Sequence, residues 1–473
     1  MSATGRFLDT LRASVGAAHV LTPAEGDLAA YEQDQRQRFR GKARAVVRPA
    51  STDEVAAVVR ACAAAGVALV PQGGNTGLAV GSVPDASGAQ IVLSTQRLRA
   101  VRALDAANAT LTAEAGCVLT QVQQAAVGAG LLFPLSLAAE GSCTLGGNLA
   151  TNAGGTQVLR YGNARELCLG LEVVTAQGEI WNGLSGLRKD NTGYALRDLF
   201  IGSEGTLGII TAATMKLFPQ PKARLVAWAA IPDLAAAVQL LARAQAALDA
   251  GLTGFEVMNR LSLALVARHY PQQRLPLRDA PWCVLLELSD SHPERHARAA
   301  LEPLLARAIE DGCVRDAVIA ENLAQATALW QGRERISPAQ AIEGLNIKHD
   351  VSLPISRIPA FVDEAGALLA REVPGARLVT FGHLGDGNLH YNVQAPEGQA
   401  GGDFLLREEQ RINTLVFDAV ARRGGSISAE HGIGSLRAAQ LPRYKPPVAL
   451  AMMRAIKHAL DPQGIFNPGR VLA

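Results

Sequence analysis

Two histidines flank a glycine-rich turn in the stretch LVTFGHLGDGNLHYNVQ. The Asp-Gly pair in this turn is typical of a tight hairpin, so the sequence predicts strands over 378–384 and 389–393. His383 and His390 are then directly opposed on one face of the hairpin, with Cβ atoms roughly 4.5–5.5 Å apart. Opposed imidazoles can bind one metal ion, although a lone pair of surface histidines is more often incidental.

A second cluster of ionisable residues, SAEHGIG at 428–434, contains Glu430 and His431. Two histidines and a carboxylate form a ligand set that is typical of catalytic metal sites, in which one position stays open for substrate. The sequence therefore predicts a metal site that combines the hairpin with this cluster.

The loop PQGGNTG, residues 71–77, follows a predicted β-α-β unit. Ser51 and Glu54 form a capping-box pattern at the start of the helix of this unit, and Gly66 ends it. A loop of this kind exposes successive backbone N–H groups, which suits a phosphate or pyrophosphate. It contains neither the Walker sequence nor GxGxxG, and on its own an ordinary turn explains it equally well.

The segment EGSCTLGGNLATNAGGTQVLRY, residues 140–161, contains five glycines and almost no bulky side chain. Its apolar Leu145, Leu149 and Val158 argue against a freely solvated loop. We expect this segment to lie against something flat and polar. A further glycine-spaced loop, DLFIGSEGTLGII, leads into a strand.

The composition limits the class of protein. A length of 473 residues predicts two or three domains, and 45 basic against 43 acidic residues give no electrostatic case for nucleic acid. The six cysteines are scattered without a CxxC pair, which is typical of reduced thiols in a protein core. No uncharged apolar run reaches the ~20 residues that a membrane span needs. We expect a cytoplasmic protein.

Beyond Pro219-Gln220-Pro221 the pattern changes to long helices that alternate with strands. This pattern predicts an antiparallel sheet covered by helices on one face. One helix is expected over 321–335, and Ser337 is placed to cap the next helix, with Pro338 at its first position. A strand is expected over 347–353.

Together these motifs resemble a known family. The runs PQGGNTGLAVGSVP, GGNLATNAGG, RKDNTGY and GSEGTLGI are similar to the flavin domain of the vanillyl-alcohol oxidase and p-cresol methylhydroxylase superfamily. The runs RERIS, GHLGDGNLHYN and SAEHGIG resemble its D-2-hydroxyacid dehydrogenase branch, and most closely the D-2-hydroxyglutarate dehydrogenases. The resemblance extends from about Ala45 to Val471.

The resemblance implies an α+β fold. It consists of a two-subdomain FAD-binding domain of the p-cresol methylhydroxylase type and a substrate domain with an antiparallel sheet covered by helices. The expected domains are 1–219 for FAD (N-terminal helices 1–43 and a flavin-binding core 44–219), 220–425 for substrate with the metal hairpin, and a C-terminal segment 426–473. This last segment is expected to complete the active site and return to the FAD domain.

The resemblance also implies FAD, with the amides of 73–77 at the pyrophosphate and 141–154 along the ribityl chain and isoalloxazine. Residues 204–209 would complete the adenosine side. Residues 71–84 contain no histidine or cysteine, so we expect the FAD to be bound non-covalently. The residues expected to bind it are Pro71, Gln72, Gly73, Gly74, Asn75, Thr76, Gly77, Ser82, Gly141, Ser142, Gly146, Gly147, Asn148, Thr151, Asn152, Gly154, Glu204, Gly208, Ile209 and Asn467.

A divalent metal is implied as well, held by His383, His390 and Glu430. Zinc is expected, although manganese, iron or cobalt suit the same ligands. The metal would stabilise the negative charge on the substrate hydroxyl while hydride leaves Cα for flavin N5. His431 would be the general base, because an ordinary imidazole exchanges protons near neutrality.

Arg333, Ser337 and Lys348 match the residues that bind substrate carboxylates in this family, and Asn392 and His431 complete the expected substrate contacts. Two alternatives remain: Ser337 as a helix N-cap, and an ion pair of Lys348 with Asp350. Arg333 and Lys348 supply charge for a four- or five-carbon diacid, and lactate would leave at least one of these cations unpaired.

The expected activity is oxidation of D-2-hydroxyglutarate to 2-oxoglutarate, with electrons passed to an electron-transfer flavoprotein, a quinone or a cytochrome. D-lactate, D-malate and glycolate are the alternative substrates. A non-catalytic flavin protein with a structural hairpin metal is an alternative of another class, against which His431 and the two cations argue. We expect a homodimer.

Overall fold

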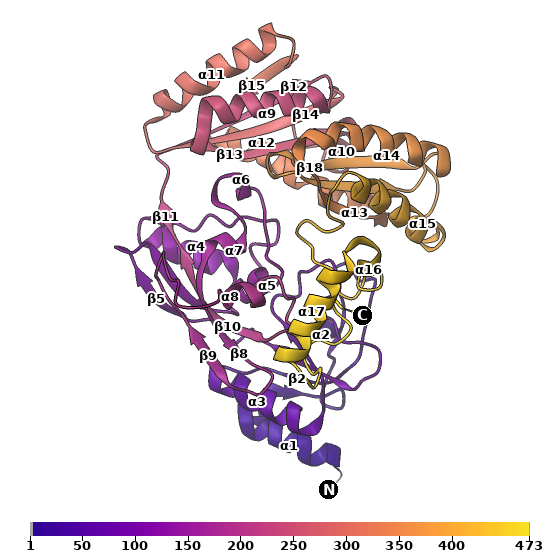
Figure 1. Cartoon of the computed structure of the whole chain (residues 1–473). Coiled ribbons are helices and arrows are strands. Elements are labelled where there is room, and N and C mark those ends of the chain that lie inside the picture. The colour runs from indigo at the N-terminus through magenta and orange to yellow at the C-terminus, as the bar shows by residue number, and fades with distance from the viewer. Residues whose placement is uncertain (1–2, 473) are drawn as a thin grey trace. The chain divides into compact units, whose positions relative to one another are not determined.

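The computed structural model describes residues 3–472, which divide into two compact units. The first unit contains the residues up to Gly154, Gly162–Gln220 and the chain from Glu430 onward. The second unit contains Gly155–Tyr161 and Pro221–Ala429 (Figure 1). A short segment of the glycine-rich stretch 140–161 thus belongs to the second unit.

The first sheet of the first unit has the order β1-β2-β4-β3, and its three longer strands are parallel. Its connecting helix, α3, begins where the sequence predicts, since the Ser51 Oγ accepts the Glu54 amide at 3.2 Å. The helix ends at Gly66, whose φ of 62° is left-handed. Helix α1 packs beside α3 (Figure 1). The bounds are α1 Ala3–Val15, β1 Val20–Leu21, β2 Ala43–Val47, α3 Thr52–Ala65, β3 Leu69–Gln72 and β4 Gln90–Ser94.

The second sheet of the first unit is antiparallel, with the order β5-β6-β10-β8-β9. The helices α4, α5 and α7 contact its strands, and the helix α17 near the C-terminus belongs to the same unit. The bounds are β5 Val101–Asp105, β6 Thr110–Glu114, α4 Leu119–Gly128, α5 Leu145–Ala150, α7 Ala164–Leu167, β8 Cys168–Val174, β9 Ile180–Gly183, α8 Arg197–Phe200, β10 Ile209–Lys216, α16 Leu441–Tyr444 and α17 Pro447–Leu460.

The second unit is built on one sheet with the order β15-β12-β14-β13-β18-β19-β16, and β17 also pairs with β19. All of its strand pairs are antiparallel. The α+β class is therefore confirmed. The bounds are β12 Ala223–Ile231, β13 Leu252–Asn259, β14 Trp282–Asp290, β15 Asp316–Ile319, β16 Asn346–Ile347, β17 Asp350–Ser352, β18 Arg377–His383 and β19 Asn388–Gln394.

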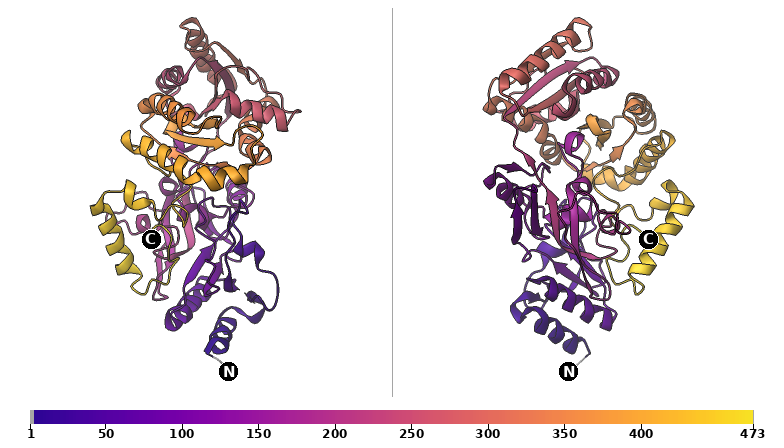
Figure 2. Two further views of the ribbon diagram at one scale, coloured as in Figure 1. Left: turned by 90° about the vertical axis from the view of Figure 1, so that its right-hand side faces the viewer. Right: turned by 60° about the vertical axis from the view of Figure 1, so that its left-hand side comes forward.

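Helices cover both faces of this sheet, so the expectation of one covered face is wrong. Val226 and Trp228 face a buried apolar cluster with side chains of α10, α12 and α13. The alternate residues Ala227 and Ala229 are also buried, and α9 and α11 contact the same strand (Figure 2). The bounds are α9 Leu234–Leu248, α10 Arg260–His269, α11 Glu294–Glu310, α12 Leu323–Glu334, α13 Ile336–Glu343, α14 Ile358–Glu372 and α15 Gly401–Arg422.

All six cysteines are buried and free, as expected for core residues. Burial raises the pKa of the Cys62 and Cys168 thiols to about 12. Within residues 3–472, no helix has both the length and the apolar character that crossing a membrane requires.

Candidate functional site

The first unit contains an open cleft of about 960 Å³, a volume that includes the solvent at its mouth. The loop after β3, the start of α5 and the loop before β10 line it. Most of the residues expected to bind FAD lie here, but Gly141, Ser142, Asn152, Gly154 and Asn467 do not line the cleft. Those that do are Pro71, Gln72, Gly73, Gly74, Asn75, Thr76, Gly77, Ser82, Gly146, Gly147, Asn148, Thr151, Glu204, Gly208 and Ile209.

The backbone of the loop after β3 is suited to an anion. The amides of residues 73–77 donate no hydrogen bond to any residue between 3 and 472. Five successive N–H groups at the wall of a cleft form a concavity that binds phosphate groups. The cleft therefore fits a pyrophosphate-containing cofactor such as FAD.

Several side chains of this loop hold the loop itself together. The Gln72 amide nitrogen donates to the carbonyl oxygens of Tyr31 (2.9 Å) and Ser82 (2.8 Å). Asn75 donates to the Gln33 carbonyl at 2.8 Å and accepts from the Ser82 hydroxyl at 2.9 Å. Gln72, Asn75 and Ser82 thus shape the cradle, and the backbone supplies its donors.

Glycine is required where this loop approaches the segment before α5. A Cβ on Gly74 would lie 2.0 Å from the Ser142 carbonyl oxygen, and one on Gly73 would lie 2.3 Å from the Thr144 hydroxyl. Thr144 in turn caps α5. By contrast, a Cβ on Gly77 would meet nothing within 4 Å. The first two glycines allow close packing of two loops, and Gly77 leaves the cleft open.

The role of Glu204 at the adenosine stays a prediction, and its carboxylate has partners within the protein. Its two carboxylate oxygens accept the backbone N–H groups of Ile433 and Gly434, each at 2.7 Å. Burial raises the pKa of Glu204, and these two hydrogen bonds oppose the shift. Although Glu204 lines the cleft, its carboxylate is bound to the loop that follows Glu430 and His431.

His431 itself lines the same cleft, among the residues expected to hold FAD. The loop is fixed from both sides, because a Cβ on Gly434 would lie 1.9 Å from the Ala79 carbonyl oxygen. Asn467 links the segments of Gly81 and Glu204, because its amide donates to the carbonyl oxygens of Gly81 (2.9 Å) and Glu204 (2.8 Å). The first unit therefore presents an imidazole on a well-anchored loop at the cofactor cleft.

In the second unit, the hairpin forms with a register different from the expected one. His390 pairs with Phe381 rather than with His383. The turn is longer than two residues, because 384–386 form a 3-10 turn and Gly387 adopts a φ of 85°. The prediction of directly opposed histidines is wrong, and His383 instead pairs with Glu256 of β13.

The two imidazoles nevertheless lie close together. Their ring centroids are 5.5 Å apart and the rings are nearly perpendicular, and each offers a ring nitrogen within 4.8 Å of the other. Each also has a carboxylate near Nδ1: Glu256 at 2.6 Å from His383, and Asp350 at 3.6 Å from His390. A carboxylate at Nδ1 leaves Nε2 as the metal-binding nitrogen. The pair fits a divalent metal.

The third expected ligand, Glu430, is the first residue of the chain's return to the first unit. It directly follows Ala429, whose amide donates to the Asp350 carbonyl at 3.1 Å. Its role as a ligand stays a prediction.

Arg333 lies on α12, and its guanidinium is held by two groups. Its Nε donates to the second oxygen of Glu256 at 2.8 Å, and its guanidinium carbon lies 4.7 Å from the centre of the Phe381 ring. Burial alone would raise the pKa of Glu256, but His383 and Arg333 outweigh it and hold that pKa at about 2. Glu256 is therefore ionised near neutral pH.

This contact corrects the charge argument for a diacid. Arg333 already has a carboxylate partner in Glu256, so a monoacid substrate such as lactate would not leave it without a counter-ion. The charge of Arg333 does not by itself select a dicarboxylate.

The other three expected substrate residues, Ser337, Lys348 and Asn392, lie on a helix, between two strands and on a strand, respectively. Ser337 is exposed in the first turn of α13 and does not cap it, because the helix begins at Ile336. Lys348 lies between β16 and β17, where the expected continuous strand is broken. Asn392 is buried on β19, where its amide donates to Gln340 at 2.9 Å and its oxygen accepts the His349 amide at 3.3 Å.

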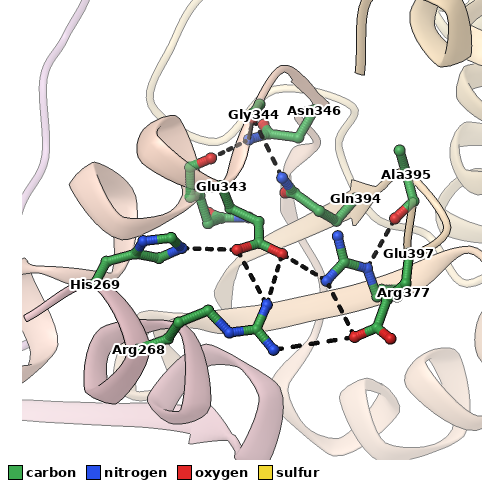
Figure 3. A network of polar contacts seen from close by, with 10 residues as sticks. Arg268, His269, Glu343, Gly344, Asn346, Arg377, Gln394, Ala395 and Glu397 are labelled. Atoms are coloured by element: carbon green, nitrogen blue, oxygen red, sulfur yellow. Dashed lines mark hydrogen bonds and ion pairs between the residues drawn. The ribbon is translucent and has the colours of Figure 1, made fainter. Parts of the chain in front are cut away.

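A polar network fixes the far end of α13. Glu343 accepts from Arg377 at 2.7 Å and from Arg268 at 3.1 Å, and lies 2.7 Å from His269 Nε2 (Figure 3). Arg377 begins β18, the strand that ends at His383. The network therefore ties the helix of Ser337 to the strand of the metal hairpin.

Glu256 is the residue that the sequence reasoning missed. The sequence does contain a signal for this residue, because Glu256 is the single charged residue of the strand LTGFEVMN. Burying a carboxylate among apolar neighbours is costly without partners, which marks such a position for attention. Its partners come from distant parts of the chain and could not be read from the pattern.

Comparison with known proteins agrees with this architecture. A family model described as FAD binding domain matches residues 43–183, and one described as FAD linked oxidases, C-terminal domain matches residues 220–471. The fold is similar to that of p-cresol methylhydroxylase, with a TM-score of 0.79 and 16% identity over 99% of this chain and 96% of that one. The fold is also similar to that of an alkyldihydroxyacetonephosphate synthase, with a TM-score of 0.74 and 17% identity over 98% of this chain and 85% of that one.

Two curated relatives are similar in sequence. The mitochondrial D-2-hydroxyglutarate dehydrogenase of Bos taurus is 41% identical over 93% of this chain and 78% of the relative. The D-2-hydroxyglutarate dehydrogenase of Xanthomonas citri pv. viticola is 42% identical over 94% of this chain and 92% of the relative.

The fold and the cofactor cleft thus define an FAD-dependent oxidoreductase. Within that class, the chain belongs to the FAD-linked oxidase family whose curated members include these D-2-hydroxyglutarate dehydrogenases.

Proposed function

We propose that this enzyme oxidises D-2-hydroxyglutarate to 2-oxoglutarate, with non-covalent FAD and a divalent metal. The activity of relatives at 41–42% identity supports this substrate. The observation that carries the proposal is the His383–His390 pair beside Arg333 in one unit. A metal and a guanidinium on one scaffold suit the hydroxy acid end and the distal carboxylate of one small diacid.

FAD is held by the cleft of the first unit. The free amides of 73–77 would bind its pyrophosphate, and the segment around α5 would hold its ribityl chain and isoalloxazine. His383, His390 and Glu430 would hold the metal, because two imidazoles and a carboxylate leave a position open for substrate. We propose zinc, although manganese, iron or cobalt suit the same ligands.

Arg333, Ser337 and Lys348 bind the carboxylates of the substrate, and Asn392 provides a further contact. When bound, FAD accepts the hydride from Cα at N5, and the metal stabilises the negative charge on the hydroxyl oxygen. His431 takes the hydroxyl proton on its imidazole nitrogen. Two electrons and one proton then leave Cα as hydride, the other proton resides on His431, and the C–O bond becomes a carbonyl.

The electrons pass to an external acceptor, an electron-transfer flavoprotein, a quinone or a cytochrome, since the sequence contains no nicotinamide-binding motif. The six buried free thiols favour a reducing compartment, and we place the enzyme in the cytoplasm as a homodimer.

The competing activity is oxidation of D-lactate, and D-malate and glycolate are further candidates. The Arg333–Glu256 ion pair is an observation in favour of lactate as substrate, because Arg333 keeps a counter-ion when a monoacid is bound. Steady-state assays with a dye acceptor and each acid decide between them. We expect kcat/KM for D-2-hydroxyglutarate to exceed that for D-lactate by at least about tenfold, and the reverse order would contradict the proposal.

A further inference from the structure

We propose that Glu256 is a positioning residue that couples the metal ligand His383 to the substrate-binding Arg333. This inference rests on the proposed function and assigns to it a residue outside the predicted ligand and substrate sets. All the contacts that carry it lie within the second unit.

The carboxylate of Glu256 is shared between two partners. One oxygen lies 2.6 Å from His383 Nδ1, and the other accepts Arg333 Nε at 2.8 Å. Glu256 is 1% exposed and faces His383 directly in the β13–β18 pairing. The strand register therefore places one buried carboxylate between the hairpin and α12.

The first contact determines which nitrogen of His383 binds a metal. The same carboxylate accepts from Arg333 Nε, and as an acceptor toward Nδ1 as well it favours the tautomer with the proton on Nδ1 and the lone pair on Nε2. Such a partner also orients the ring and increases its basicity. Without this acceptor, the tautomer with a proton on Nε2 becomes available, and that tautomer cannot bind a metal through Nε2.

The second contact determines which edge of Arg333 faces a ligand. The guanidinium is planar and offers its donors in a rigid fork. With Nε bound to Glu256 and the plane held against Phe381, the terminal nitrogens remain to bind a carboxylate in a fixed direction. One side chain thus sets the orientation of a metal ligand and of a substrate ligand.

Glu287 is a second buried glutamate of the same sheet, and its partners are structural residues. It is equally buried on the adjacent strand β14 and binds the same helix α12 through Trp330 Nε1 at 2.7 Å. It also binds Arg224 at 2.6 Å and Thr253 at 3.0 Å. It contacts no expected ligand or substrate residue, so it is a matched control for burial and helix attachment.

Glu256→Gln separates the roles because an amide has one acceptor atom and one donor group. If its oxygen faces His383, its NH₂ meets the Arg333 Nε–H. If its oxygen faces Arg333, its NH₂ donates to His383 Nδ1 and forces the proton onto Nε2. The second orientation prevails, because a guanidinium only donates whereas Nδ1 of a neutral imidazole can also accept, so the variant impairs metal binding through Nε2.

The test measures zinc affinity by competition with a chromophoric chelator, on purified FAD-loaded wild type, Glu256→Gln and Glu287→Gln. Flavin content and thermal midpoints check that each variant is folded. We expect Glu256→Gln to bind zinc about 10- to 100-fold more weakly, and Glu287→Gln to stay within about twofold of wild type. If Glu256→Gln fails to fold, Glu256→Asp is compared with Glu287→Asp in the same assay, with the same expected order.

Coupling to Arg333 is measured with a double-mutant cycle in kcat/KM for D-2-hydroxyglutarate. The combined loss in Glu256→Gln/Arg333→Lys should fall short of the product of the single losses by at least about fivefold. In Glu287→Gln/Arg333→Lys, the combined loss of kcat/KM should equal the product of the two single losses. Zinc affinity of Glu256→Gln equal to that of Glu287→Gln, or multiplicative losses in both cycles, overturns the inference. Wild type that oxidises the substrate without metal contradicts the proposed function instead.

Discussion

At the scale of single residues, three buried glutamates lie in strands of the described chain, and their partners distinguish them. Glu172 binds the hydroxyls of Thr52 and Thr211, and Glu287 binds Trp330 and Arg224. Glu256 alone among these three pairs with residues that the sequence assigns to chemistry. Residue type and spacing predicted the two histidines and the family resemblance predicted Arg333, but the partners of each depend on contacts made across the sheet.

Replacing Arg333 with lysine tests its role at the substrate. A lysine keeps the charge but offers one compact ammonium, which cannot serve Glu256 and a substrate carboxylate in the same fork geometry. We expect the KM for D-2-hydroxyglutarate to rise about tenfold or more, which corresponds to the loss of a hydrogen bond to a charged group. Steady-state kinetics with saturating acceptor measure the change.

Arg335→Lys is the matched control, because Arg335 contacts Gln273 and Tyr270 instead. Its KM should stay within about twofold of wild type, since neither partner is an expected substrate or metal residue. Equal KM values in both variants would remove Arg333 from the substrate site.

At the scale of elements, the predicted strands were found but the hairpin register was not. The two β-type runs on either side of the Asp-Gly turn predict β18 and β19 well. The register depends on the turn, and the Asp-Gly pair suggested a two-residue loop. Instead 384–386 form a 3-10 turn, and Gly382 adopts a φ of 151° where a Cβ would lie 2.6 Å from the Asn388 carbonyl oxygen. Such close approaches of backbone cannot be read from the sequence.

The loop that carries His431 provides a second prediction. Glu204 accepts both the Ile433 and Gly434 amides, and a glutamine would accept one and turn its NH₂ toward the other. In Glu204→Gln we expect anaerobic flavin reduction to slow at least about tenfold, because a misplaced base loses catalytic efficiency. Flavin absorbance per protein should stay unchanged.

Ser203→Ala is the control for this variant, since Ser203 lines the same cleft but its hydroxyl binds the Phe200 carbonyl. Loss of FAD from Glu204→Gln with an unchanged rate in the remaining holoenzyme would restore the original assignment of Glu204 to the cofactor.

The Glu343 network predicts a pH-dependent attachment of α13. Burial alone would raise the pKa of Glu343, but hydrogen bonds from Arg377 and His269 outweigh it and lower that pKa below 4.5. The stabilisation is therefore fully present above pH 4.5 and is lost as the pH falls through the lowered pKa. Glu343→Gln should lower the free energy of unfolding by about 1–3 kcal/mol at pH 7, and by less at pH 4.

Urea unfolding followed by tryptophan fluorescence measures this difference, because Trp228, Trp282 and Trp330 lie in the second unit. Glu397→Gln is the control: Glu397 is exposed, and its contacts with Arg268 and Arg377 are 4.0 and 3.9 Å. It should change stability by less than about 1 kcal/mol. A Glu343→Gln effect that grows toward acid pH would contradict the assigned charge state.

At the scale of the whole molecule, the family and the fold class followed from motifs spread over most of the chain. The glycine loops predicted a cofactor cleft, and the first unit contains one lined by most of those residues. Helices were predicted that pack on each face of the large sheet, α12 and α13 on one and α9 and α11 on the other, but the expectation of one covered face was wrong. A strand buried on both faces shows no alternation, so the pattern does not show on which face a helix packs. The charge argument for a diacid also failed, because it counted cations without the buried Glu256.

The measurement that tests the central claim most directly is anaerobic reduction of the bound flavin. The purified yellow protein is mixed with D-2-hydroxyglutarate before and after treatment with a chelator, and again after zinc is restored. Our account predicts rapid bleaching that the chelator abolishes and zinc restores, while the FAD stays bound throughout. Bleaching that is unaffected by complete metal removal would contradict the metal's role, and no bleaching by D-2-hydroxyglutarate in the zinc-loaded protein would contradict the proposed substrate.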